Sequence, residues 1–389
     1  MYDIIIRNGK KLNGNFEFVD NDLMCIKDGR IVAPNPIEVI EGANREIDAT
    51  DCMITPGLID SHIHVYHAGG SYNLNVSPDV ACLPNGVTTC IDGGSAGPFT
   101  FESFYQGDIV PAQTTVKAML HMSFNGVMPF GWDEIEDPKS FDKKMIKRLW
   151  EKYPDTIIGL KIRLIDRSTN GMGTSPLEAT VEMAERLEQE TGRKCLVTCH
   201  VSDLAEDVQM DDITRILRRG DVFTHLYQNS GPKTLLNNED KVLDCIFEGK
   251  EKGILFDSGC ATGMFSVHNI LKAFEQGVYP DLIGTDIVGF NFYKMPCMSM
   301  PFVASMLYNM GMPMGKVFEA LTTKANEAYH IGDVGTLETG KTADIALFKL
   351  TEKDMKYDDK FGGSFIGKKL FVPMATIKEG RILYQNLTL

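Results

Sequence analysis

Two histidines stand one residue apart at the end of an apolar run, and no other part of the sequence has a clearer chemical meaning. Residues 54–64 read ITPGLIDSHIH, and the run ends in His62 and His64. Alternate side chains of a β-strand point to the same face, so both imidazoles can reach one metal ion. Neutral imidazoles are good ligands for zinc and similar divalent ions. The pair therefore predicts a metal site at the end of a strand.

Four more residues with ionisable side chains lie in or at the end of other short apolar runs. Each run reads as a buried strand, and the four residues are Lys161, His200, His225 and Asp286. Imidazoles and carboxylates can bind a metal ion, whereas a protonated lysine has no lone pair to offer. A hydrogen-bonded core histidine or a structurally paired lysine could explain each residue taken alone. Their joint occurrence, in order and near strand ends, favours a metal centre.

Parallel β/α units would bring these residues together. Residues of about 54–335 alternate strand-like and helix-like segments, which is typical of such units. The strands are expected to end near residues 64, 94, 125, 163, 200, 225, 258 and 286. Eight units make an α/β fold of the TIM type, a (β/α)8 barrel whose active site lies at the C-terminal ends of the strands. All the candidate ligands fall at those ends.

The helix expected after the fourth strand has the clearest boundaries. Ser175 is predicted to cap it, with Pro176 at the first helical position and Glu178 at the third. Gly192 is predicted to end it, since glycine commonly terminates helices.

The two ends of the chain have a different pattern from the middle. Residues 1–53 and 336–389 alternate short β-rich runs with turns, and Asp28-Gly29 between two such runs predicts a hairpin. Neither end has enough apolar surface to fold alone. We therefore expect them to form one small composite β-sandwich domain, with the barrel over residues 54–335.

The set of six residues resembles the amidohydrolase superfamily of metal-dependent hydrolases, in its branch with two metal ions. The resemblance implies that His62, His64 and Asp286 bind one ion and that His200 and His225 bind the other. It further implies that Lys161 is carbamylated by carbon dioxide and bridges the ions together with a hydroxide. The cofactors implied are thus two divalent metal ions, with zinc as the expected metal, and carbon dioxide. Asp286 would accept the proton of the attacking hydroxide and pass it to the leaving group.

One departure from the superfamily pattern limits which group of enzymes the chain can resemble. Dihydroorotase-like enzymes of this superfamily carry an arginine two residues beyond the second histidine, and here that position is Tyr66. The chain looks most like a group of bacterial proteins, often labelled dihydroorotases, that act as deacetylases. The resemblance implies deacetylation of a small N-acyl amino acid or acylated hydroxy acid, a substrate that bears a carboxylate.

The substrate pocket is less well defined by the sequence. Arg163 lies two residues past Lys161, on the same face of its strand, and could hold the carboxylate in a bidentate contact; a salt bridge between barrel strands explains it equally well. Met295 to Met300 could line the pocket, although core packing is more usual for such a run. Further candidate substrate contacts come from strand-end loops: Tyr66, Tyr227, Asn229 and Ser258.

Three other functions stay open. A cyclic amidohydrolase, of the dihydroorotase or hydantoinase type, would use the same metals with a different pocket. A deaminase usually has a glutamate three residues past the fifth-strand histidine, where this chain has Asp203. A non-catalytic scaffold built on the barrel would be expected to have lost ligands, and none of the six is missing.

The composition limits which binding partners and which cellular compartment are expected. The net charge of −14 and the pI near 5.1 argue against nucleic acid or an anionic membrane as partner. The first residues lack the pattern of a signal peptide, and no apolar stretch is long enough to span a bilayer, so we expect a cytoplasmic protein. The nine cysteines form no Cys-x-x-Cys pair and are expected to be reduced. Barrels of this type commonly self-associate, but no segment identifies a homo-oligomer interface.

Overall fold

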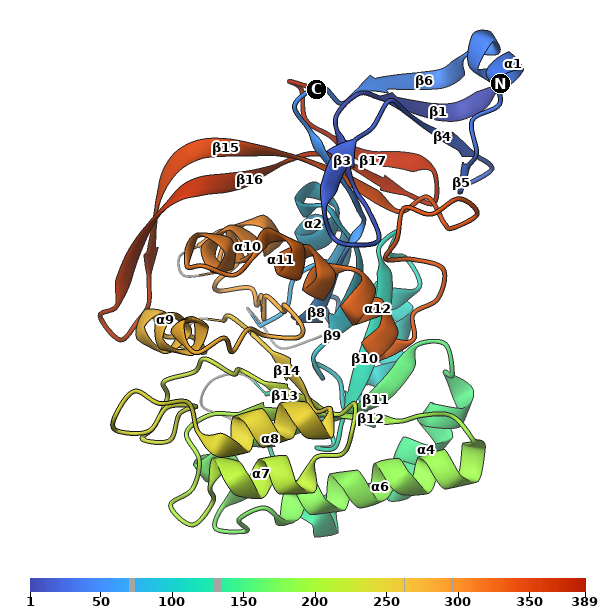
Figure 1. Ribbon diagram of the computed structural model, residues 1–389. Coiled ribbons are helices and arrows are strands. Elements are labelled where there is room, and N and C mark those ends of the chain that lie inside the picture. Colours follow the sequence, from blue (N-terminus) through green and yellow to red (C-terminus); the bar gives the residue numbers. More distant parts are fainter. Residues whose placement is uncertain (70–73, 129–133, 262, 295–296) are drawn as a thin grey trace.

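Seven parallel strands in chain order form the centre of the protein (Figure 1). The computed structural model describes residues 1–69, 74–128, 134–261, 263–294 and 297–389. The strands are β8 (Leu58–Ile63), β9 (Val87–Asp92), β10 (Thr115–His121), β11 (Ile157–Leu164), β12 (Leu196–Val201), β13 (Val222–Thr224) and β14 (Leu255–Asp257). They read as near-continuous apolar runs because parallel strands covered by helices are buried on both faces.

The barrel closes without a regular eighth strand. Isolated bridges join Ile63 to Ile287 and Asp257 to Leu282, so residues 282–287 fill the gap between β14 and β8. The predicted TIM-type architecture is confirmed, but the expected eighth strand is wrong in detail. Its backbone turns into a left-handed conformation at Asp286 (φ 49°), which is incompatible with a continuing strand. The third strand likewise ends at His121 rather than near residue 125.

Helices occupy the connections between the strands. Their bounds are α1 Pro36–Glu41, α2 Pro78–Cys82, α3 Phe101–Phe104, α4 Lys143–Lys152, α5 Asp166–Thr169, α6 Ser175–Thr191, α7 Met210–Ile216, α8 Asp244–Lys252, α9 Val267–Glu275, α10 Met300–Asn309, α11 Met314–Leu321 and α12 Thr323–Tyr329. Short 3-10 turns cover Leu83–Asn85 and Pro138–Ser140, and a π turn covers Tyr105–Ile109.

Helix α6 corrects one predicted cap. The N-cap residue is Thr174, one position before the predicted Ser175, and its hydroxyl donates to the Glu178 carboxylate at 2.9 Å. Ser175 is already helical and donates to the Met172 carbonyl instead. Gly192 ends the helix with φ 69°, as predicted.

The two ends of the chain build two further sheets that pack together above the barrel (Figure 1). One sheet has the order β5-β4-β1-β6 and the other the order β17-β16-β15-β7-β2-β3. The strands are β1 Tyr2–Arg7, β2 Lys10–Leu12, β3 Phe18–Asp20, β4 Leu23–Lys27, β5 Arg30–Val32, β6 Ala43–Asp48, β7 Met53–Pro56, β15 Ile345–Asp358, β16 Ser364–Lys378 and β17 Arg381–Gln385.

Contacts between the two ends are extensive. Ile4, Ile26 and Ile54 share a buried cluster with Ile345 and Ile377. The Asp28-Gly29 hairpin is confirmed, with both residues at positive φ between β4 and β5. Strand β7 pairs with β15, so residues 54–56 belong to a terminal sheet although the sequence pattern assigns them to the barrel.

Three other expectations concern single features. All nine cysteines are buried and free. No helix within the described ranges is both long and apolar enough to cross a bilayer. In the run from Met295 to Met300, residues 295–296 lie outside the described residues, while Met300 begins α10 and is buried in the main core.

Candidate active site

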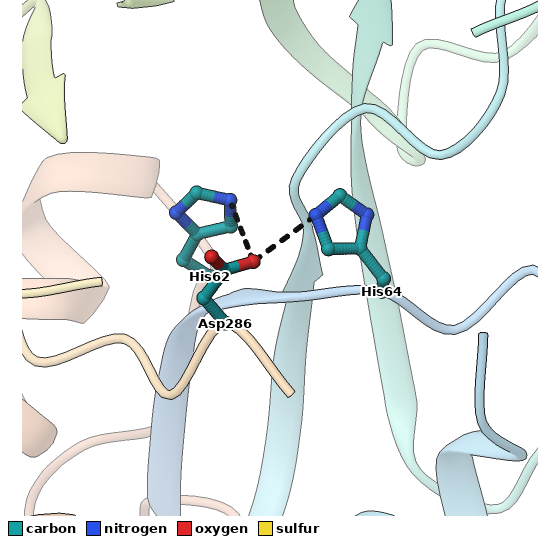
Figure 2. A group of neighbouring side chains, drawn as sticks. All are labelled: His62, His64 and Asp286. Carbon is teal, nitrogen blue, oxygen red and sulfur yellow. Dashed lines mark ion pairs between the residues drawn. The ribbon is translucent and has the colours of Figure 1, made fainter. Parts of the chain in front are cut away.

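Two histidines and an aspartate meet where β8 ends (Figure 2). His62 lies in β8, His64 follows the strand by one residue, and both side chains are buried. Asp286 comes from the closing segment, and its Oδ1 lies 3.2 Å from Nε2 of His64 and 3.7 Å from Nε2 of His62. The HxH spacing and the turn at Asp286 thus bring three metal-binding side chains together.

A chain of hydrogen bonds determines which nitrogen of His64 faces this centre. Nδ1 of His64 lies 2.8 Å from Oγ of Ser95, and that hydroxyl donates to the Asp92 carboxylate at 2.7 Å. Because the Ser95 hydrogen is used, Oγ must accept from Nδ1. The lone pair of His64 is therefore on Nε2, directed at Asp286. A cation between these two acceptors would satisfy both.

His62 is oriented in the same way. Its Nδ1 lies 2.9 Å from the hydroxyl of Thr224 and 3.3 Å from the carboxylate of Asp257. Thr224 itself donates to Asp257, so Nδ1 carries the hydrogen and Nε2 presents a lone pair. Carboxylates that orient the remote nitrogen of an imidazole are a common feature of metal sites.

His200 and His225 form a second pair, with His200 in β12 and His225 directly after the adjacent strand β13. Nδ1 of His225 donates to the Gly259 carbonyl at 2.8 Å, since a carbonyl can only accept. Its Nε2 is therefore unprotonated and lies 2.8 Å from Nδ1 of His200. Burial lowers the pKa of His225 to about 3 and that of His200 well below its ordinary value, so both rings are neutral at pH 7. Neutral imidazoles are the form that binds metal.

Lys161 lies between the two pairs. It comes from β11, is fully buried, and its Nζ lies 3.3 Å from Nε2 of His62. No ion pair involves Lys161 within the described part of the chain. Burial lowers its pKa to about 8, which favours the neutral amine. The neutral amine is the form that reacts with carbon dioxide, so the site fits a carbamylated lysine as well as a metal centre.

The charge of Asp286 is stabilised by its neighbours. Burial raises the pKa of this carboxyl group, but a proton shared with the facing His62 and His64 rings lowers it more, so the pKa lies below its ordinary value. Asp286 and His225 both adopt left-handed backbone conformations, with φ 49° and 70°. Such conformations cost free energy in residues other than glycine and concentrate at functional sites.

A cavity of about 250 Å³ opens directly onto these residues. Its polar walls include His64, Lys161, His200 and Asp286. Its apolar walls come from strand-end loops and comprise Leu74, Val127, Met128, Ile165, Ala261, Met264, Val288 and Phe290. Arg163, Arg167 and Lys360 add positive charge to the wall, and Asp203 adds one carboxylate. The cavity can therefore accommodate a small molecule that has both an apolar group and an anionic group.

Arg163 reaches the cavity but has a partner inside the protein. Nη1 of Arg163 lies 2.5 Å from Oε1 of Glu134, a carboxylate that also accepts from the Met128 amide and the Ser168 hydroxyl. Arg163 thus forms a salt bridge, but with a loop residue and not between barrel strands as the second explanation expected. The acid that holds it, Glu134, follows no strand pattern, and sequence reasoning missed it.

The remaining predicted substrate contacts do not line the described part of the cavity. The Tyr227 hydroxyl donates to the Val278 carbonyl, and the Ser258 hydroxyl donates to the Gly284 carbonyl. The Tyr66 ring is buried against Phe104. Asn229 is half-buried and is absent from the cavity wall.

Several residues that orient the site gave no signal in the sequence. Ser95, Thr224 and Asp257 contact His64 or His62 from three different strand ends. His121 and Glu136 form a buried pair nearby, 3.7 Å apart. Thr224 and Asp257 are the last residues of their strands, so a search for polar residues at strand ends could have found them.

A family model matches just over half of the chain, residues 184–383, and describes the amidohydrolase family. This chain belongs to the amidohydrolase family. It is a hydrolytic enzyme, and enzymes of this family typically use two divalent metal ions. The cluster of His62, His64 and Asp286 gives this amidohydrolase a metal-binding group of the expected kind.

Curated relatives extend over the whole amidohydrolase chain. A deacetylase of Enterococcus faecalis is 28% identical over 388 residues, which is 99% of this chain and 100% of the relative. A deacetylase of Agrobacterium fabrum is 28% identical over 353 residues, covering 90% of this chain and 84% of the relative.

Solved structures show the same architecture. One, described as an adenine deaminase, superposes with a TM-score of 0.87 at 26% identity and covers 99% of this chain and 100% of its own. Another, described as a dihydroorotase, has a TM-score of 0.86 at 26% identity and covers 99% of this chain and 98% of its own. The amidohydrolase barrel and its terminal sheets thus recur together in proteins whose described activities differ.

Proposed function

We propose that this amidohydrolase is a metal-dependent deacetylase of small N-acyl amino acids or acylated hydroxy acids. The observation that carries the proposal is a cavity with cationic and apolar side chains in its wall that opens onto the cluster of His62, His64 and Asp286. The full-length relatives described as deacetylases support the reaction class. Tyr66, at the position where dihydroorotase-like enzymes carry a substrate-binding arginine, disfavours dihydroorotate.

In the proposed enzyme His62, His64 and Asp286 would hold one divalent ion, and His200 and His225 would hold the second. Carbamylated Lys161 would supply the carboxylate shared by the two, and zinc is the expected metal. When bound, the ions would polarise the acyl carbonyl and lower the pKa of water. Asp257 and the Asp92–Ser95 pair would keep His62 and His64 oriented with Nε2 inward.

Asp286 would move the proton during catalysis. The pKa of its carboxyl group lies below the ordinary value, so the group is a carboxylate that can accept a proton from the attacking water. It lines the cavity and can deliver that proton to the amine or alkoxide leaving group. The apolar walls would exclude bulk water from the acyl carbon.

The test is a panel of initial rates with zinc-loaded protein. The panel holds N-acetyl amino acids of both hands, acetylated hydroxy acids, dihydroorotate, hydantoins and adenine, and it follows acetate, ring opening and ammonia separately. Acetate release with a chiral preference is the expected result. Ring opening without acetate would instead identify a cyclic amidohydrolase, and ammonia release from adenine would identify a deaminase. A His62→Asn/His64→Asn double variant, purified identically, controls for contaminating hydrolases.

The remaining partners follow from the same proposal. The partner is a small molecule with a carboxylate, and nucleic acid and membranes are not expected because the chain carries a net charge of −14. A cytoplasmic location and self-association into a homo-oligomer are further proposals. Size-exclusion chromatography with light scattering tests whether the protein forms a homo-oligomer.

A further inference from the structure

The longest strands of the protein carry a lysine to the mouth of the barrel. β15 and β16 have 14 and 15 residues and form one antiparallel hairpin, paired from Ile345 with Ile377 to Asp358 with Ser364. Figure 1 shows this hairpin leaving the terminal sheets, passing over α10 and reaching α9 at its tip. The tip residue Lys360 lies in the wall of the active-site cavity.

The hairpin is held in this position along its length. The side chain of Asn309, at the end of α10, accepts from the amides of Lys368 and Lys369 and donates to the Lys369 carbonyl. The Ser305 hydroxyl of α10 accepts from the Phe371 amide at 2.9 Å. These bonds join β16 to a helix of the barrel.

The tip has its own anchor. The Asp359 carboxylate accepts from the Val267 amide at the start of α9 at 2.7 Å, and from the amides of Phe361 and Gly363 at 2.8 Å each. An acidic side chain is stabilised at a helix N-terminus by the helix dipole. Lys360 follows Asp359 directly, so its backbone position is determined by this anchor.

The Lys360 side chain lies across a glycine. A Cβ added to Gly263 would meet Nζ and Cε of Lys360, and Gly263 has φ +91°. The positive φ favours glycine at this position, and the absence of a Cβ leaves space that the Lys360 side chain uses. The loop after β14 therefore accommodates the Lys360 side chain where it enters the cavity wall.

Lys360 has no carboxylate partner within the residues that the structure describes. Its Nζ lies over the neighbouring Phe361 ring, 5.5 Å from the ring centroid. Arg163, in contrast, is bound to the buried Glu134. Of these two cations in the cavity wall, Lys360 is the one whose charge is not balanced by an internal acid.

We propose that Lys360, delivered by the β15–β16 hairpin, binds the carboxylate of the acyl substrate and selects for substrates that carry one. This inference rests on the proposed deacetylase function and adds a specificity residue to it. The ammonium group would form a charge-assisted hydrogen bond with the carboxylate, a contact that an uncharged carboxamide does not provide.

Matched substrates and variants test the proposal. Steady-state kinetics are measured on an N-acetyl amino acid that the wild type hydrolyses and on the carboxamide of the same compound. The variants are Lys360→Met and Lys360→Arg, and Lys353→Met on the same hairpin is the control. Lys360→Met is expected to raise KM for the carboxylate substrate about tenfold, to change kcat less than about twofold, and to leave the carboxamide unaffected. Lys360→Arg should restore most of the affinity, and Lys353→Met should match the wild type.

The possible results distinguish a failure of the Lys360 proposal from a failure of the proposed deacetylase function. An unchanged KM in Lys360→Met, or an equal loss on carboxylate and carboxamide, would overturn the role of Lys360 while leaving the deacetylase intact. If the wild type releases no acetate from any acyl compound, the proposed function fails and the inference with it. Asp359→Ala keeps the Lys360 ammonium group but removes the carboxylate that anchors the hairpin tip. This variant should also raise KM severalfold for the carboxylate substrate, and an unchanged KM would contradict delivery by the hairpin.

Discussion

Nε2 of His64 lies 3.2 Å from Oδ1 of Asp286. Because Nδ1 of His64 donates its hydrogen to Ser95, Nε2 carries a lone pair that faces this carboxylate oxygen. Two hydrogen-bond acceptors at this distance repel unless a cation or a proton lies between them. At His225 the Gly259 carbonyl occupies Nδ1, and Nε2 faces Nδ1 of His200 at 2.8 Å. The His64–Asp286 pair is therefore arranged to share a cation or a proton.

Replacing Asp286 with Asn should separate proton transfer from metal binding. We expect Asp286→Asn to lower kcat at least about a hundredfold, because the amide cannot accept the proton of the attacking water. Most of the metal should remain, since five other predicted ligands are unchanged. Metal analysis and kcat of the same preparation check this, with the exposed Asp354→Asn as the matched control. Unchanged turnover would remove Asp286 from the mechanism.

Ser95→Ala should weaken metal binding without touching a ligand. The change removes the acceptor that holds Nδ1 of His64, so the ring loses its preferred orientation. Loss of such a supporting contact typically costs about 10- to 100-fold in metal affinity. Competition with a chelator measures the affinity, and Ser140→Ala, on the surface, serves as the control. Equal affinities for the two variants would show that His64 needs no such support.

Lys161 should couple metal uptake to carbon dioxide and to pH. Burial lowers its pKa to about 8, so the neutral amine increases as the pH rises through that value. Zinc uptake by metal-free protein with added bicarbonate should therefore be faster at pH 9 than at pH 6. Lys161→Ala should lose this dependence and most of its activity. Uptake that is equally fast in buffer stripped of carbon dioxide would exclude carbamylation.

The Arg163–Glu134 pair should matter for stability. Both side chains are largely buried, at 12% and 1% exposure. Arg163→Met leaves a buried carboxylate without its counter-ion, which costs about 3 kcal/mol or more of unfolding free energy. The double variant Arg163→Met/Glu134→Gln should regain more than half of that loss. Urea denaturation of the three proteins checks it. A single variant as stable as the wild type but with a raised KM would instead assign Arg163 to the substrate.

Glu136 should make the metal-free protein less stable as the pH rises. Burial, with Glu134 nearby, raises the pKa of Glu136 to about 8. Between the ordinary pKa of an unfolded glutamate, about 4.3, and about 8 the native state binds the extra proton, so stability falls as the pH increases through this window. Glu136→Gln removes the effect and should exceed the wild type at pH 9 by an amount on the order of a few kcal/mol.

Chelator-treated protein unfolded in urea at pH 5, 7 and 9 measures the effect of Glu136. The exposed Glu182→Gln should follow the wild-type profile at all three values. A constant difference between Glu136→Gln and the wild type at every pH would show that the carboxyl group does not titrate in this range.

The sequence by itself determined the residue types, their order and the barrel. His62, Lys161 and His200 lie in apolar runs, and His64, His225 and Asp286 follow such runs, because parallel strands are buried and their C-terminal ends meet at one rim. Local periodicity therefore predicted both the elements and the shared location of these residues. That they bind two metal ions stays a prediction, to be tested by metal analysis.

Tertiary structure alone decided which groups pair. Glu134 neutralises Arg163 from 29 residues away, and no local pattern marks it, because an ion pair depends on two side chains meeting in space. Which nitrogen of His62 and of His64 is hydrogen-bonded was decided by Thr224 in β13 and by Ser95 in the loop after β9. Lys360 reaches the cavity only because a long hairpin crosses α10 and is anchored at α9. Sequence periodicity reports burial along one strand, whereas such contacts arise from the packing of distant elements.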